Sequence, residues 1–137
     1  MSLLTTGALQ QELTAIGARL RAITVLVEGV GHRRARAGQG SGIVWSADGT
    51  IVTNAHVATA DRARVTLADG RAARAQVVAR DARRDLAILR VDRDALGPAP
   101  LDVATLGTPA ALRPGELVLA LGHPLGVAHA LAMGVVH

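Results

Sequence analysis

The fold of this chain is decided by residues 40–54, which read GSGIVWSADGTIVTN. Ile43, Val44 and Trp45 on one side of the centre of this stretch and residues 50–53 (TIVT) on the other are β-branched or aromatic, as is typical of strands. The Asp48-Gly49 pair between them is a strong signal for a hairpin turn. The stretch therefore predicts a β-hairpin with strands near residues 40–46 and 50–54.

The same kind of pattern continues on both sides of this hairpin. Apolar runs separated by loops and turns, Asp69-Gly70 among them, predict further strands near residues 22–29, 63–68, 72–80, 86–92 and 116–122. Residues 93–115 contain four prolines and predict a long connection with little regular structure. Seven short strands joined by hairpin turns indicate an antiparallel barrel or a sandwich, and periodicity alone does not choose between them.

Only the N-terminal segment has a helical period. Leu9, Leu13, Ile16 and Leu20 recur at spacings of four, three and four, with polar residues between them. We therefore expect a helix over residues 5–21, ahead of the strands.

Composition limits the classes of function. Half of the 137 residues are apolar, but Phe, Tyr and Cys are absent and Trp45 is the single aromatic residue, so the core must consist of small branched side chains. The absence of cysteine excludes a disulfide-stapled scaffold. The 15 basic residues are all arginines, mostly scattered, and the net charge is only +4. Nucleic acid is not expected as a partner, because this surface offers neither a phosphate-binding stripe nor a stacking platform.

Membrane insertion and metal binding find no support in the sequence. No apolar run approaches the roughly 20 residues that span a bilayer, and no signal peptide is visible. His123, His129 and His137 are spaced by six and eight residues, which does not place three ligands on one helix face. We therefore expect neither a metal nor another cofactor.

Two residues stand where functional groups are often displayed. His56 follows the predicted strand at 50–54, within Thr53–Val57 (TNAHV), and Asp85 opens the predicted strand at 86–92. Strand ends commonly present catalytic groups, but a single histidine or carboxylate there is more often an ordinary surface or turn residue.

The order and spacing of the motifs change that interpretation. Residues 40–44 (GSGIV), 53–57 (TNAHV), 85–91 (DLAILRV), 115–126 (GELVLALGHPLG) and 134–136 (GVV) occur in register along about 100 residues. This series resembles the trypsin-like serine proteases of the bacterial HtrA (Deg) type. The absence of a cysteine after the histidine favours the cysteine-free branch of that family.

The resemblance implies a role for each site residue. His56 would be the general base, and Asp85 the carboxylate that orients it. Ser41 matches a structural Gly-Ser-Gly segment and Ser46 a turn, so neither is expected to be the nucleophile. In the family the nucleophilic serine, the oxyanion hole and the substrate pocket belong to a second barrel, and none of these three features has a matching residue here.

The resemblance also implies a domain organisation. We expect an all-β fold, a six-stranded antiparallel Greek-key barrel that is the first barrel of the trypsin-like fold, preceded by the helix. Residues 1–21 would form the helical extension, 22–127 the first barrel and 128–137 the start of a second one. The strand and turn at 115–126 would close the first barrel.

Three functions follow as hypotheses. The first is the N-terminal half of an HtrA-like serine endopeptidase, inactive alone, which acts on polypeptides once a second barrel completes it. The second is a stand-alone protease-like adaptor that binds and no longer cleaves. The third is a small barrel whose resemblance is only structural. We also expect self-association through apolar surface around residues 121–136, and an extracytoplasmic location by family analogy alone.

Overall fold

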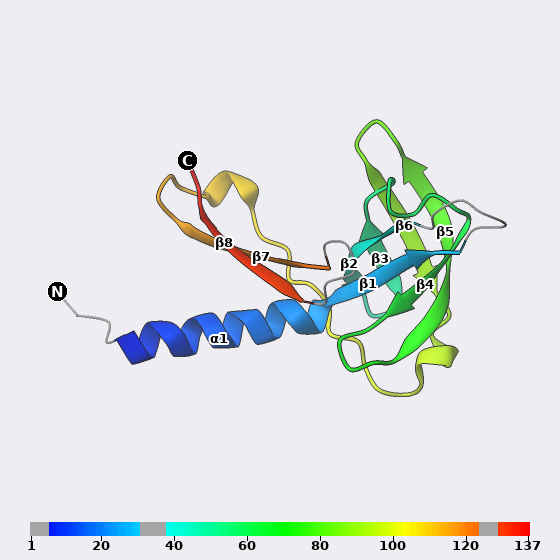
Figure 1. Cartoon of the computed structure of the whole chain (residues 1–137), viewed down its shortest axis with the longest axis horizontal. Coiled ribbons are helices and arrows are strands. Elements are labelled where there is room, and N and C mark those ends of the chain that lie inside the picture. Colours follow the sequence, from blue (N-terminus) through cyan, green and yellow to red (C-terminus); the bar gives the residue numbers. More distant parts are fainter. Residues whose placement is uncertain (1–5, 31–37, 124–128) are drawn as a thin grey trace.

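The computed structural model describes residues 6–30, 38–123 and 129–137. Along these residues one helix precedes eight strands (Figure 1). The elements are α1 (Thr6–Ile23), β1 (Thr24–Gly29), β2 (Gln39–Ser46), β3 (Thr50–Thr53), β4 (Arg62–Thr66), β5 (Ala72–Asp81), β6 (Leu86–Val91), β7 (Leu117–Gly122) and β8 (Ala130–Val135), with 3₁₀ turns η1 (Asp94–Leu96) and η2 (Pro109–Ala111). The predicted helix and all seven predicted strands are present.

The first six strands form a closed antiparallel barrel in the order β1-β2-β3-β6-β5-β4. The chain runs through β1, β2 and β3 as neighbours and then crosses so that β4 pairs with β1. A fourth strand that returns to the first one is the Greek-key arrangement. The structure therefore confirms the predicted all-β class and chooses the barrel over the sandwich.

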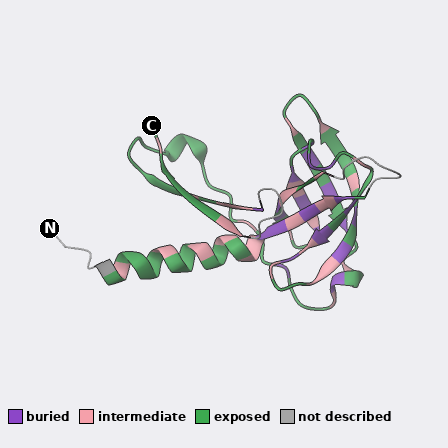
Figure 2. Cartoon of the chain, viewed as in Figure 1, coloured by how far each residue is buried: buried purple, intermediate pink, exposed green. Residues whose placement is uncertain are grey.

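Small branched side chains fill the barrel, as the composition predicted. Alternate residues of each strand point inward; in β6 these are Ala87, Leu89 and Val91. The largest fully buried side chains are Val25, Val27, Val44, Ile51, Val65 and Leu89. Trp45 is 45% exposed and does not take part in this core. Figure 2 shows the buried residues concentrated in the barrel.

Both predicted Asp-Gly turns join neighbouring strands. Gly49 lies between β2 and β3 with φ 91°, and Gly70 lies between β4 and β5 with φ 88°. Residues with a Cβ rarely adopt this conformation, so glycine at these two positions permits the turns.

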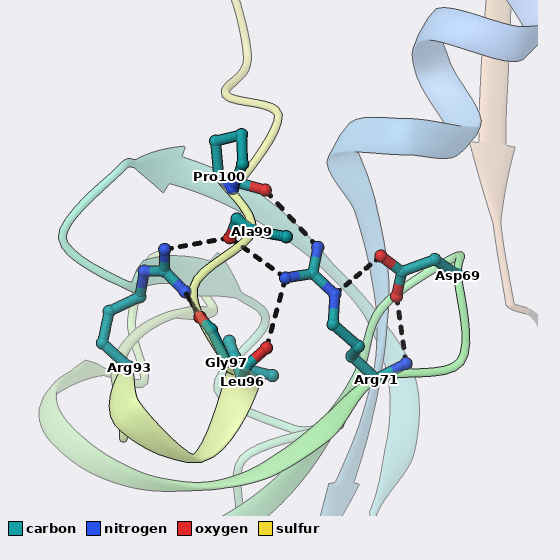
Figure 3. A network of polar contacts seen from close by, with 7 residues as sticks. All are labelled: Asp69, Arg71, Arg93, Leu96, Gly97, Ala99 and Pro100. Carbon is teal, nitrogen blue, oxygen red and sulfur yellow. Dashed lines mark hydrogen bonds and ion pairs between the residues drawn. The ribbon is translucent and has the colours of Figure 1, made fainter.

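One arginine attaches the long connection after β6 to the barrel. Arg71 donates through Nη1 to the carbonyl oxygens of Leu96 and Ala99, at 3.2 and 3.1 Å. Its Nη2 donates to Pro100 O at 3.4 Å, and its Nε donates to Asp69 at 2.7 Å (Figure 3). Three of these four bonds reach the irregular segment and hold it in place without a strand pairing, while the bond to Asp69 fixes the guanidinium.

The position of β7 differs from the expectation. β1 pairs with both β2 and β4, so the six-stranded barrel is already closed and has no free edge for another strand. β7 instead pairs with β8 in a separate two-stranded sheet, which lies alongside α1 (Figure 1). The expectation that the strand at 115–126 closes the first barrel is therefore wrong; residues 124–128 of that segment lie outside the described residues.

Within the described part of the chain, no helix combines the length and the apolar character needed to cross a membrane.

Candidate catalytic pair

A tight turn after β3 displays His56. The carbonyl oxygen of Asn54 accepts hydrogen bonds from the N–H groups of Val57 and Ala58, both at 3.1 Å. Val57 and Ala58 are buried, whereas the His56 side chain is 71% exposed. A Cβ on Gly40 would lie 2.5 Å from a methyl group of Val57, so only glycine permits this packing. The turn is thus anchored in the core while its histidine faces outward.

Asp85 stands at the start of β6, next to the end of β3. The two strands are antiparallel neighbours, with Thr53 opposite Ala87, and this register brings the two loops together. Asp85 has φ 54°, an uncommon conformation for a residue other than glycine, although Asp tolerates it better than most. Arg84 binds Asp81 at 2.7 Å, so it does not compete for Asp85.

The two predicted site residues are in direct contact. His56 Nδ1 lies 2.7 Å from Asp85 Oδ2, and the His56 backbone N–H donates to Asp85 Oδ1 at 2.9 Å. The bond from the backbone N–H, and then the bond from the ring, hold the pKa of Asp85 below its usual value. An ionised carboxylate only accepts hydrogen bonds, so Nδ1 carries the proton and Nε2 of the neutral ring is the acceptor. This is the tautomer that a general base requires.

Sequence reasoning gave no role to a third residue at this place. Asn54 Nδ2 donates to the carbonyl oxygen of Asp85 at 3.0 Å and to its Oδ2 at 3.2 Å. The signal for Asn54 in the sequence is its place in the TNAHV motif (residues 53–57), two residues before His56. Its contact depends on the pairing of β3 with β6, which the sequence pattern does not reveal.

The two serines in the described residues are occupied elsewhere. The Ser41 Oγ accepts a hydrogen bond from the His123 N–H at 2.7 Å, and the Ser41 carbonyl accepts one from Thr53 Oγ1 at 2.6 Å. Ser46 Oγ donates to Asp48 in the β2–β3 turn. Both serines therefore stabilise local structure.

The remaining histidines offer no metal centre in the described residues. His123 is buried and its ring contacts that of His129 edge to face, with centroids 4.9 Å apart. Desolvation lowers the pKa of both rings. The described part of the chain contains no cluster of three or more His, Cys, Asp or Glu side chains that could hold a metal ion.

Comparison with known proteins shows the family of this chain. Residues 40–137 match the model of the trypsin-like peptidase domain. The chain belongs to the trypsin-like peptidase family. His56, Asp85 and the barrel strands β3 to β6 lie within the matched region, whereas β1 precedes it.

Relatives of this peptidase domain are of the HtrA type. The "Probable periplasmic serine endoprotease DegP-like" of Halomonas elongata is 41% identical over 107 residues, which cover 77% of this chain and 22% of that protein. "Protease Do-like 1, chloroplastic" of Arabidopsis thaliana is 44% identical over 102 residues, which cover 72% of this chain and 22% of that protein. The similarity therefore extends beyond bacteria, and the chain spans 22% of the length of either relative.

A solved structure has the same fold. The structure titled "HtrA-type protease AlgW with decapeptide" superposes with a TM-score of 0.70 at 29% identity, over 86% of this chain and 43% of that one. The trypsin-like domain described here thus corresponds to less than half of that protease chain.

Proposed function

We propose that this chain supplies the histidine and the aspartate of an HtrA-like serine endopeptidase. The observation that supports the proposal best is the 2.7 Å contact between His56 Nδ1 and Asp85 Oδ2. A serine hydroxyl presented to Nε2 would transfer its proton to His56 as its oxygen attacks the peptide carbonyl. Asp85 would stabilise the imidazolium, which then protonates the leaving amine.

Among the described residues, no serine is placed to act as the nucleophile of this pair. The chain has three serines, at positions 2, 41 and 46. Ser41 and Ser46 bond to other groups, and Ser2 lies outside the described residues. The residual catalysis of roughly 10³–10⁴-fold that survives loss of a triad member comes from an oxyanion hole and substrate binding. We therefore propose that this chain alone, residues 1–137, does not cleave peptides.

Exposure of the pair supports a two-part site. The side chains of His56 and Asp85 are 71% and 45% exposed, so water screens their interaction. A triad functions with its carboxylate shielded from water. In the proposed function a second barrel covers the pair, brings the serine to Nε2, and forms with this barrel the cleft for a polypeptide substrate.

The hairpin β7–β8 supports an additional proposal. Its apolar side chains are exposed although the described chain has a well-filled core elsewhere; they are Leu117 (59%), Val118 (39%), Leu131 (51%), Met133 (64%) and Val135 (55%). Exposed apolar patches mark sites of association. We propose that the hairpin face that carries Leu117, Leu131, Met133 and Val135 packs against another polypeptide, either the second barrel or, in the isolated chain, a further copy.

A fluorophosphonate probe tests the proposed function, because it labels only an activated serine. The chain is fused to the part of the AlgW protease that lies beyond the matched region. The fusion should be labelled on a serine of the added part, the same fusion with His56→Ala should not be labelled, and the chain alone should remain unlabelled. Labelling of Ser41 or Ser46, or labelling that persists in His56→Ala, would contradict the proposal.

A further inference from the structure

The Asp85 loop depends on one amide side chain. Asn54 Nδ2 donates both to the backbone carbonyl of Asp85, at 3.0 Å, and to its carboxylate Oδ2, at 3.2 Å. An amide has two N–H groups, so one Asn side chain can serve both acceptors at once. We propose that Asn54 is a positioning residue that sets the backbone and the side chain of Asp85 together, and thereby aims Oδ2 at His56 Nδ1.

The backbone of Asp85 needs such support. Its φ of 54° lies in the left-handed region, where a residue other than glycine is strained and persists only when its surroundings hold it. The bond from Asn54 to the Asp85 carbonyl fixes the peptide that follows this strained residue. Because Asn54 comes directly after β3 and Asp85 directly before β6, the bond also joins two neighbouring strand ends.

The carboxylate benefits from the second bond of the amide. Oδ2 accepts from both His56 Nδ1 and Asn54 Nδ2, and Oδ1 accepts from the His56 backbone. The donor from Asn54 contributes to the lowered pKa of Asp85, after the larger contributions of His56. A carboxylate with three donors keeps one rotamer, so the ring of His56 meets a fixed acceptor.

The relative position of His56 and Asp85 is therefore fixed within one barrel. All three side chains come from the β3 and β6 strand ends, so the His–Asp geometry exists before any second barrel approaches. This inference rests on the proposed function for its catalytic meaning, since presetting matters only if His56 acts as a base. The contacts themselves are independent of that function.

NMR titration of the chain tests the positioning role without an activity assay. The carboxyl carbon of Asp85 and the Nδ1–H of His56 are followed against pH in the unsubstituted chain, in Asn54→Ala and in Asn54→Asp. The pH midpoint of the Asp85 titration should rise by about 0.5 pH unit in Asn54→Ala, which lacks the donor. It should rise by about 1 pH unit in Asn54→Asp, which adds a like charge. The Nδ1–H signal of His56 should weaken in both variants.

Gln39→Ala is the matched control, because the Gln39 amide also donates to a carboxylate, Glu28 Oε1, at 3.3 Å, and its side chain is exposed. It should leave Asp85 and His56 unchanged. An unchanged Asp85 midpoint and His56 signal in folded Asn54→Ala would overturn the inference. If Asn54→Ala does not fold, Asn54→Asp decides by the same criterion. Neither signal requires peptide cleavage, so this result is independent of the fluorophosphonate test of the fusion, which decides the proposed function separately.

Discussion

At the scale of single residues, the site is built around one carboxylate. Asp85 accepts hydrogen bonds from the backbone and the ring of His56 and from Asn54. Donors to the charged form lower the pKa of a carboxyl group, as is found for Asp85. The stability of the fold is therefore linked to the ionisation of this group.

The substitution Asp85→Asn should destabilise the fold in a pH-dependent way. The folded pKa of Asp85 lies below the unfolded value of about 3.9, so its ionised form contributes stability above about pH 4 and loses it as the pH falls through the folded value. Urea unfolding of the unsubstituted chain and of Asp85→Asn is measured from about pH 7 down to the pH at which acid unfolds the chain. The difference in unfolding free energy between the two proteins should shrink below about pH 4. Asp102→Asn is the control, since Asp102 is exposed in the connection after β6. An Asp85→Asn penalty that is equal at all pH values would contradict this account.

The sequence predicted His56 and Asp85, but it did not predict how they are held. The motif order identified both residues, because each sits in a distinctive local pattern. Asn54 was overlooked because its partner is 31 residues away along the chain and reaches it only through the β3–β6 pairing. The exposure of the pair likewise depends on what covers the barrel, which no local pattern encodes.

At the scale of elements, close packing of one strand against the histidine turn positions the site. Gly40 in β2 lies against Val57, and a Cβ at position 40 would meet a methyl group at 2.5 Å. Val57 is buried and β-branched, so it cannot swing away. A methyl group added to Gly40 must therefore displace the turn that carries His56.

The substitution Gly40→Ala should destabilise the barrel by about 1–3 kcal/mol, the usual cost of overpacking. It should also weaken the His56 Nδ1–H signal, because the turn shifts relative to Asp85. Denaturant unfolding and histidine NMR measure the two effects. Gly107→Ala is the matched control, since a Cβ there has no atom within 4 Å. Equal stability of the two variants would show that the turn adapts without cost.

Element types were readable from the sequence, whereas the partner of β7 was not. Hairpin turns and short apolar runs located the strands because both signals are local. Strand pairing is decided by closure: once β4 pairs with β1, the barrel accepts no further strand, and β7 turns to β8. That competition is a property of the assembled sheet.

At the scale of the whole molecule, the barrel and the hairpin differ in burial. Figure 2 shows buried residues across the barrel and exposed ones along most of β7 and β8. α1 lies beside the hairpin, with Gly17 close to a Leu131 methyl group, but it leaves the apolar side chains of β8 exposed. The hairpin is therefore the surface through which the chain should associate.

Self-association through the hairpin should appear in sedimentation velocity as a weight-average mass that rises with concentration. Met133→Ser should reduce the rise, because Met133 is 64% exposed on β8. Leu106→Ser is the control, since Leu106 is 63% exposed but lies in the connection before β7. A mass that is independent of concentration in the unsubstituted chain would argue against association.

The central claim is that His56 and Asp85 form the base and the orienting carboxylate of a peptidase. The most direct measurement is kcat for peptide cleavage by the AlgW fusion, with Asp85→Asn compared against Asp81→Asn. Asp81 is a nearby carboxylate that pairs with Arg84 instead of His56. We expect Asp85→Asn to lower kcat by about 10⁴-fold, through loss of the correct tautomer, and Asp81→Asn to leave it nearly unchanged. An active fusion whose kcat is unaffected by Asp85→Asn would contradict the claim.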